Sequence, residues 1–225
     1  MNATAPVLPR YTPDGLPASW LAVPPPPTGF HRGELHFREA RTDNGDIEMI
    51  CEWMNRPHTA KGWEYDWPLE RWDAHIRAQL RTGYSRPVVV ERHGRPIAYM
   101  EFYRMAQDIV GHHYQARPHD LSVHLAIADL ADTGQGLGSR IIGDITEEFL
   151  ERDPACDAVV FEPDAANSAS RKMIENNGAS LLGEVKVRHR HIALYVRVRD
   201  GQPLPRIGQP VWTPSADTDT DADAG

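Results

Sequence analysis

A single histidine stands in a short apolar run where its side chain could do acid–base chemistry. In LSVHLAIA, residues 121–128, strand alternation places on one face Leu121, Val123, Leu125 and Ile127. The other face carries His124 among small residues, which leaves room around the imidazole. An unperturbed imidazole, with a pKa of about 6.5, takes up a proton near neutral pH. His124 is therefore a candidate general base, and a hydrogen-bonded structural histidine is the alternative.

A glycine-rich turn follows this strand and leads into a helix. In TGQGLGSR, residues 133–140, the residues Gly134, Gly136 and Gly138 alternate with others. Such a turn at a helix N-terminus presents free backbone N–H groups and the positive end of the helix dipole, which bind an anion, usually phosphate. No Lys-Ser or Lys-Thr follows the glycines, and their spacing does not fit the dinucleotide fingerprint. The turn predicts a phosphate-bearing ligand of another kind, with a plain tight turn as the alternative.

Composition limits the partners of this chain. Its 225 residues carry a net charge of −8, which disfavours non-specific nucleic-acid binding. Two cysteines are too few for a disulfide framework, and no stretch has the apolar length of a membrane span. The eleven histidines match no metal-ligand spacing, including the group His112, His113, His119 and His124. We expect a cytoplasmic protein without nucleic-acid, membrane or metal partners.

Hydrophobic periodicity predicts the elements that must position these residues. Strands are expected at 34–40, 86–92, 95–105, 120–129, 157–163, 183–188 and 190–199. Helices are expected at 47–54, 69–80, 137–152 and 167–178, the last capped by Asn167. The order β-α-α-β-β-β-α-β-α-β-β predicts an α+β fold, a mixed sheet with helices packed on it.

The two ends of the chain differ from its middle in composition. Residues 1–30 are rich in proline, with an unbroken run at 24–27, and are expected to be disordered, without regular helix or sheet. Residues 213–225 are acidic and small and predict a disordered tail. The folded domain is expected to span residues 31–212.

The glycine turn and the segment EPDAANSASRKMIENNGA, residues 162–179, together resemble the acyl-CoA-binding core of the GNAT N-acyltransferase superfamily. The resemblance implies the GNAT fold, a mostly antiparallel mixed sheet with a splayed strand pair, and acetyl-CoA or another acyl-CoA as the donor. The cofactor contacts that it implies are Leu125, Ile127, Thr133, Gly134, Gln135, Gly136, Leu137, Gly138, Ser139, Asn167 and Arg171.

Two positions depart from the superfamily pattern. Thr133 stands where Gln or Arg is usual, a mild change because the contact comes chiefly from backbone. Ile174 stands where many members carry a Tyr that protonates the departing thiolate. Another group, or water, must supply that proton here.

Within the superfamily, the chain is similar over roughly residues 33–200 to the acyltransferases of siderophore biosynthesis, which acylate lysine side chains, N-hydroxylysine or N-hydroxylated diamines. The matching segments are EWMNRPHTAKGW (52–63), the Y-x-E-x-Y pattern (99–103), PHDLSVHLAI (118–127) and EPD (162–164). The resemblance implies that Asp164 lies near His124, where it orients the imidazole or binds the amine. It implies a small amine or hydroxylamine acceptor, other enzymes of such a pathway as partners, and acceptor contacts from His58, Trp63, Glu101 and Tyr103.

The expected reaction is direct acyl transfer to the acceptor nitrogen. A strand amide near Leu125 or Ile127 would polarise the acyl carbonyl, and His124 would take the proton. Two alternatives remain open. The segments EWMNRPH and GQGLGSR also resemble aminoglycoside N-acetyltransferases, and Ile174 is compatible with a non-catalytic module that only binds acyl-CoA.

Overall fold

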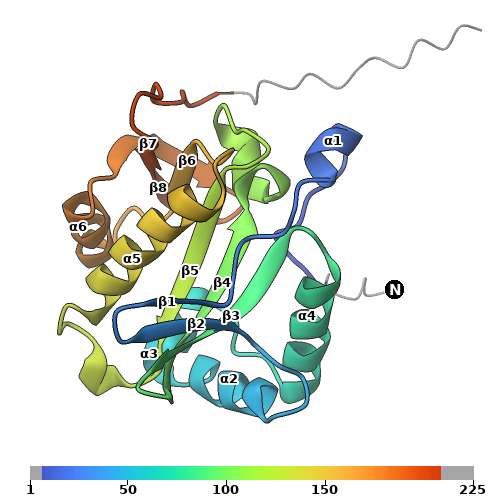
Figure 1. Ribbon diagram of the computed structural model, residues 1–225, viewed down its shortest axis with the longest axis vertical. Coiled ribbons are helices and arrows are strands. Elements are labelled where there is room, and N and C mark those ends of the chain that lie inside the picture. The colour runs from blue at the N-terminus through green and yellow to red at the C-terminus, as the bar shows by residue number, and fades with distance from the viewer. Residues whose placement is uncertain (1–6, 209–225) are drawn as a thin grey trace, which may run out of the picture.

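One sheet runs through the molecule and carries the candidate residues. The computed structural model describes residues 7–208, whose eight strands form a sheet in the order β1-β2-β3-β4-β5-β6-β8-β7 (Figure 1). The strands are β1 (Phe30–Arg32), β2 (Leu35–Glu39), β3 (Ser85–Arg92), β4 (Arg95–Arg104), β5 (Leu121–Ile127), β6 (Ala158–Phe161), β7 (Ser180–Val187) and β8 (Arg190–Val198). The α-helices are α1 (Ala18–Leu21), α2 (Asp46–Met54), α3 (Pro57–Trp63), α4 (Leu69–Arg81), α5 (Leu137–Arg152) and α6 (Ser168–Asn176).

Strands β5 and β6 pair in parallel, and only briefly. Their register covers Leu121 opposite Val159 and Ser122 opposite Val160, whereas β5 pairs with β4 along its whole length. Beyond Ser122 the two strands separate. The second half of β5 therefore offers an open strand edge, as expected for the splayed pair.

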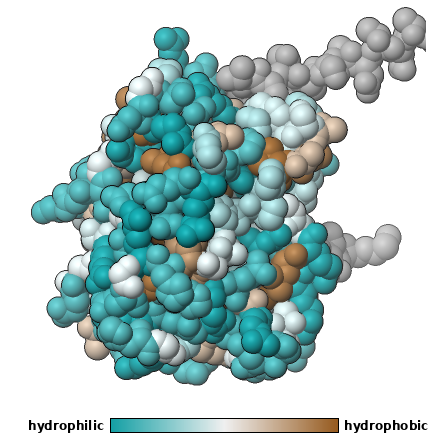
Figure 2. All heavy atoms as spheres, viewed as in Figure 1, coloured by the Kyte–Doolittle hydropathy of each residue, from teal (hydrophilic) through white to brown (hydrophobic). Residues whose placement is uncertain are grey.

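Helices cover both faces of the sheet (Figure 1). Ile141, Ile145 and Phe149 of α5 pack in one buried cluster with Leu121 and Val123 of β5. The opposite face packs against α2 and α4 in a second cluster. On the side of the molecule shown in Figure 2, polar surface predominates and apolar atoms appear only in small separate patches. Apolar burial thus fixes β5 from both sides.

The expected α-helices and strands are confirmed, and the structure adds two α-helices and one strand that were not expected. These are α1, α3 and β1. Helix α3 has a proline in its first turn and buries only Thr59, so it has no apolar stripe for periodicity to detect. Strand β1 has three residues and pairs with β2. Short elements of this kind depend on their neighbours more than on their own sequence.

The expectation of a disordered segment before residue 31 is wrong for residues 7–30, which include the short helix α1. Residues 7–30 pack on the domain: Leu16 and Val23 are buried, and Arg104 donates a hydrogen bond to the Pro24 carbonyl at 2.8 Å. Proline restricts the unfolded chain and so lowers the entropy cost of ordering such a segment. The predicted acidic tail lies outside the described residues. In residues 7–208 no helix is long and apolar enough to cross a bilayer.

Candidate active site

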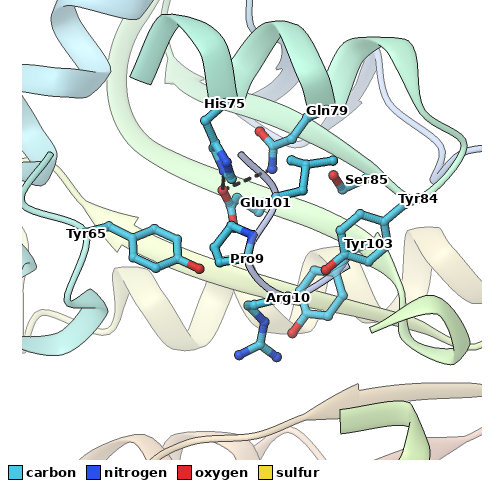
Figure 3. A pocket seen from close by; sticks show the side chains of 10 residues that line it. Pro9, Arg10, Tyr65, His75, Gln79, Tyr84, Ser85, Glu101 and Tyr103 are labelled. Carbon is cyan, nitrogen blue, oxygen red and sulfur yellow. Dashed lines mark hydrogen bonds and ion pairs between the residues drawn. The ribbon is translucent and has the colours of Figure 1, made fainter. Parts of the chain in front are cut away.

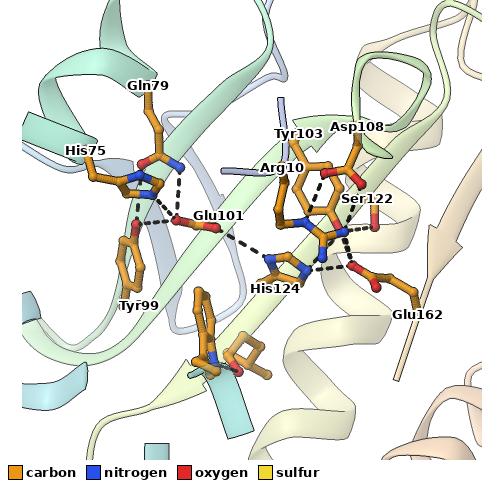
Figure 4. Close-up of polar contacts among 12 residues, drawn as sticks. Arg10, His75, Gln79, Tyr99, Glu101, Tyr103, Asp108, Ser122, His124 and Glu162 are labelled. Carbon is orange, nitrogen blue, oxygen red and sulfur yellow. Dashed lines mark hydrogen bonds and ion pairs between the residues drawn. The ribbon is translucent and has the colours of Figure 1, made fainter. Parts of the chain in front are cut away.

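His124 lies between two carboxylates in the middle of the sheet (Figure 4). It stands on β5 directly opposite Glu101 of β4. Its Nδ1 is 3.4 Å from Glu101 Oε2, and its Nε2 is 2.8 Å from Oε1 of Glu162, which follows β6. The Tyr103 hydroxyl is 3.1 Å from the same Nε2 and donates to Glu162 Oε1 at 3.0 Å. Because a carboxylate only accepts hydrogen bonds, the geometry favours a ring protonated on both nitrogens.

The electrostatic surroundings of His124 agree with this protonation. Burial lowers the pKa of the imidazole and the charge of Arg10 lowers it further, but hydrogen bonds to the two carboxylates outweigh both and raise it above 6.5. Burial works in the opposite direction on the acids. Hydrogen bonds from His124 and His75 nevertheless hold the pKa of Glu101 well below its usual range. The charge of Arg10 and the bond to His124 do the same for the pKa of Glu162. The surroundings of His124 thus shift its pKa from that of a free imidazole.

The acid that reaches the imidazole is Glu162 and not Asp164. Asp164 is exposed, and its Oδ1 accepts a hydrogen bond from the Ala166 N–H at 2.9 Å. No hydrogen bond or ion pair between described residues joins Asp164 to His124, so the expected pairing is not formed. Strand alternation does not separate the two acids, because residues 162 and 164 have the same parity; what separates them is that β6 ends at Phe161 and Asp164 lies in the turn beyond it. Glu162 has the parity of Val160, on the face of β6 turned away from α5.

Arg10 closes the acid side of this cluster from the N-terminal segment. Its Nε lies 3.0 Å from Asp108 Oδ2, its Nη2 lies 2.8 Å from Oδ1, and the same Nη2 pairs with Glu162 Oε1. The side chains of the two acids are 0% and 2% exposed. Buried carboxylates are costly without such a partner. Sequence reasoning missed Arg10 and Asp108 because no motif connects residues so far apart.

Glu101, predicted to bind a cationic acceptor, is instead surrounded by the protein's own donors. It is buried, and its Oε1 accepts hydrogen bonds from His75 at 2.8 Å, Gln79 at 3.0 Å and Tyr99 at 3.1 Å. Its other oxygen faces His124. This geometry favours a carboxylate that holds the imidazole over one that contacts the acceptor.

Of the other predicted acceptor contacts, Tyr103 is buried in the cluster around His124, whereas Trp63 and His58 lie along the second half of β5. Trp63 Nε1 donates to the Leu125 carbonyl at 3.3 Å, and its ring meets that of His124 edge-on with centroids 5.3 Å apart. His58 Nε2 lies 3.1 Å from the Ile127 carbonyl. Both rings therefore border the place where β5 leaves β6.

The amides of Leu125 and Ile127 face the same open edge. The Ala128 N–H bonds to the Ile97 carbonyl at 3.0 Å, and alternate residues of an antiparallel strand bond to the same neighbour, so residues 125 and 127 point away from β4. A Cβ added at Gly138 would lie 3.6 Å from the Ile127 side chain and 3.8 Å from that of Leu125. The N-terminus of α5 thus lies against this part of β5.

The glycine turn has the geometry of an anion site. Gly134 and Gly136 have positive φ angles of 72° and 83°, and a Cβ on either would meet no atom within 4 Å. Backbone conformation, not crowding, requires glycine here. Gly136 is the N-cap of the 16-residue helix α5, and Gln135 beside it is exposed. The free N–H groups of the turn and the dipole of α5 suit a phosphate.

Four further side chains of the predicted cofactor set form hydrogen bonds to other residues of the protein. Their partners are the Leu130 carbonyl for Thr133 (2.7 Å), Asn177 Nδ2 for Ser139 (3.0 Å), the Ser170 N–H for Asn167 (3.0 Å), and the Tyr195 hydroxyl and Glu184 for Arg171 (3.0 and 2.8 Å). Leu137 and Ile174 are buried in the core. Asn167 caps α6 as expected, and these contacts favour backbone groups over side chains as the main candidates for cofactor contact.

Comparison with known families identifies this arrangement. Residues 42–187 match the model of the acetyltransferase (GNAT) domain. The chain belongs to the GNAT acetyltransferase family. It is 40% identical over 189 residues to lysine N-acyltransferase MbtK of Mycolicibacterium paratuberculosis, with 84% of each chain covered. It is 28% identical over 159 residues to an N(6)-hydroxylysine O-acetyltransferase of Escherichia coli, covering 71% of this chain and 50% of that protein.

The solved structure of an aminoglycoside acetyltransferase, AAC(6')-Ib in complex with coenzyme A, shares the fold of this GNAT protein. The TM-score is 0.62 at 19% identity, and the alignment covers 73% of this chain and 95% of the other. The GNAT fold expected from the sequence is confirmed, and the protein is an acyltransferase with acyl-CoA as donor.

The residues of this GNAT protein fit that donor. The amides around Gly134 and Gly136 can bind its pyrophosphate, and those of Leu125 and Ile127 can meet its thioester end. Among residues 7–208 no group of three or more His, Cys, Asp or Glu side chains could hold a metal ion.

Proposed function

We propose that this protein acylates the side-chain nitrogen of a lysine-type amine or an N-hydroxylated diamine in the biosynthesis of a hydroxamate siderophore. The lysine N-acyltransferase relative supports the lysine-type acceptor, and the hydroxylysine acetyltransferase supports the siderophore setting. The observation that carries the chemistry is His124 between Glu101 and Glu162, where β5 and β6 separate. A cytoplasmic setting and partners from the same pathway belong to this proposal.

The proposed reaction is direct transfer without an acyl-enzyme. Acyl-CoA supplies the thioester carbonyl, and the N–H of Leu125 or Ile127 donates a hydrogen bond to its oxygen. The acceptor nitrogen bonds to the carbonyl carbon, the carbon–sulfur bond breaks, and the nitrogen's proton passes to His124. Burial raises the pKa of the Cys51 thiol and raises that of Cys156 to about 12, which leaves both poor nucleophiles.

His124 can accept this proton only after it has lost its own. Its raised pKa means that the base form appears as the pH rises through a midpoint above 6.5. An N-hydroxylamine is a weaker base than an alkylamine and arrives mostly neutral at pH 7, so it demands less of His124. We therefore expect N-hydroxylated acceptors to react at lower pH than lysine.

One carboxylate oxygen remains available to the acceptor. Glu162 Oε2 is buried and has no hydrogen-bond partner among the described residues, although it forms an ion pair with Arg190 Nη1 at 3.5 Å. A buried carboxylate oxygen that accepts no hydrogen bond favours a nearby N–H group that can donate one. It supports a position for the acceptor nitrogen beside Nε2 of His124.

Release of free thiol from acetyl-CoA and longer acyl-CoA thioesters tests this function. Lysine, N6-hydroxylysine, N-hydroxycadaverine and kanamycin are offered in parallel. We expect turnover with one or more of the first three, and only background hydrolysis with kanamycin. A clear preference for kanamycin would support an aminoglycoside acetyltransferase, and acyl-CoA binding without any turnover would support the non-catalytic module.

A further inference from the structure

The N-terminal segment of residues 7–10 crosses the acid–base cluster and touches it at both ends. At one end His75 Nδ1 lies 2.7 Å from the Val7 carbonyl, while its Nε2 lies 2.8 Å from Glu101 Oε1. Pro9 and Arg10 lie between His75 and Tyr103 and line a pocket of only about 10 Å³, room for about one water molecule (Figure 3). The segment therefore forms a wall of the site and nearly fills the space behind Glu101.

At the other end Arg10 is held from behind by Asp108. That acid accepts two hydrogen bonds from the guanidinium, one from the Tyr84 hydroxyl at 2.6 Å and one from the Val110 N–H at 2.9 Å. The Arg10 guanidinium also lies 5.7 Å from the ring centre of Tyr103. With so many fixed partners, the guanidinium presents Nη2 to Glu162 in one defined orientation.

We propose that Arg10 is a positioning residue of acyl transfer, which holds Glu162 against Nε2 of His124 while Asp108 supports it. The inference rests on the proposed function, because it gives Arg10 a part in the same proton transfer. One oxygen, Glu162 Oε1, receives both the guanidinium and the imidazole. Any movement of Arg10 therefore moves the carboxylate that orients the base.

The charges around His124 show what Arg10 adds. Negative and positive groups alternate from Glu101 through His124, Glu162 and Arg10 to Asp108 (Figure 4). The two neighbouring carboxylates raise the pKa of the imidazole, and the Arg10 charge opposes them. Other titratable or charged groups also face these five residues. They are Tyr99 and Tyr103 of β4, His75 of α4, Tyr65, Tyr84 just before β3, and Arg190 of β8. Arg10 thus limits how far the carboxylates raise the pKa of His124.

Full-length Arg10→Gln, Arg10→Lys and Arg77→Gln proteins test the inference. The titration midpoint of His124 is followed by NMR on histidine-labelled protein, with His124→Gln to assign its signal, and kcat/KM is followed against pH. For Arg10→Gln we expect the midpoint and the acidic limb to move to higher pH and kcat to fall by up to about 100-fold. Arg10→Lys keeps the charge and should restore the midpoint. Its kcat stays reduced because an ammonium cannot make the two-point contact with Asp108. Arg77, paired on the surface with Asp73, is the matched control and should leave both unchanged.

The outcomes separate this inference from the proposed function. Normal kcat and an unmoved His124 midpoint in Arg10→Gln would overturn it, and so would a loss of kcat with the midpoint unmoved. If that variant does not fold, Asp108→Asn decides: kcat should fall, and full activity would overturn the inference. The NMR titration needs no acceptor. An unmodified protein that acylates nothing rejects the proposed function, even where the midpoint still depends on Arg10.

Discussion

Two sites lie along β5, the donor site at its C-terminal end and the acid–base cluster around His124, and they are assembled in different ways. At the C-terminal end, the strand, the glycine turn and the first turn of α5 follow one another within residues 121–139, and the anion site is built of backbone groups. Around His124, side chains converge from distant parts of the chain, and Arg10 and Glu162 are 152 residues apart. The first site is local and tolerant of side-chain change. The second depends on every partner reaching its place, so single substitutions should affect it far more.

The largest expected effect is that of His124→Ala. Loss of a general base should lower kcat by about 10²–10⁴-fold and leave acyl-CoA binding unchanged, because the glycine turn is untouched. The raised pKa keeps the unmodified imidazole protonated at low pH, so its activity should fall on acidification below a midpoint above 6.5, and the variant should lose this limb. His93→Ala, at a residue whose side chain is 76% exposed, is the control. Full activity of folded His124→Ala would remove the catalytic role.

The next effect distinguishes the two acids of the EPD segment. Glu162→Gln should lower kcat by about 100-fold, because the base loses its orienting carboxylate. It should also move the acidic limb to lower pH, since that carboxylate raises the pKa of His124. Asp164→Asn should change kcat less than about 2-fold, as for an exposed turn residue. Steady-state rates against pH make the comparison, and an equal loss in both variants would return Asp164 to the site.

A smaller loss is expected from a chain that begins at Tyr11. It lacks the Val7 carbonyl and Arg10 but keeps the buried anchors Leu16 and Val23, so it should fold and bind acyl-CoA. Turnover should fall by about 10-fold or more, because the cluster loses one wall. Thiol release reports on the acid–base cluster, and a CoA thermal-shift assay reports on the donor site. Turnover equal to that of the full chain would show that the segment lies on the domain without serving the site.

The smallest effect is expected from a substitution at the glycine turn, which should leave the acid–base cluster around His124 unaffected. Gly136→Asp places a like charge beside the bound pyrophosphate, so the KM for acyl-CoA should rise by about 10-fold and its thermal stabilisation should shrink. Turnover at saturating donor and the His124 midpoint should stay near their normal values. Gly94→Asp, at a turn glycine with a φ of 76°, controls for backbone strain. A collapse of kcat in Gly136→Asp but not in Gly94→Asp would show that the donor site and the acid–base cluster are coupled.

Much of this protein follows from local sequence. Alternation in residues 121–128 placed His124 on the face opposite the apolar one, and the helical stripe of α5 and the Asn167 cap formed as predicted. The glycine turn could be predicted from the sequence because its anion-binding groups are the backbone N–H groups of consecutive residues. Short-range sterics and periodic burial act over a few residues, and a sequence states them directly.

The tertiary structure alone decided which side chains surround His124. The EPD segment offers two acids, and only the end of β6 turns Glu162 toward the ring while Asp164 closes an exposed turn. Arg10 stands in a proline-rich segment that composition assigned to disorder, yet two buried carboxylates hold it in the site. The raised pKa of His124 has the same origin, because it sums charges that only the folded chain brings together. Electrostatics of a buried cluster depends on distances in space, and the spacing of residues along the chain does not contain them.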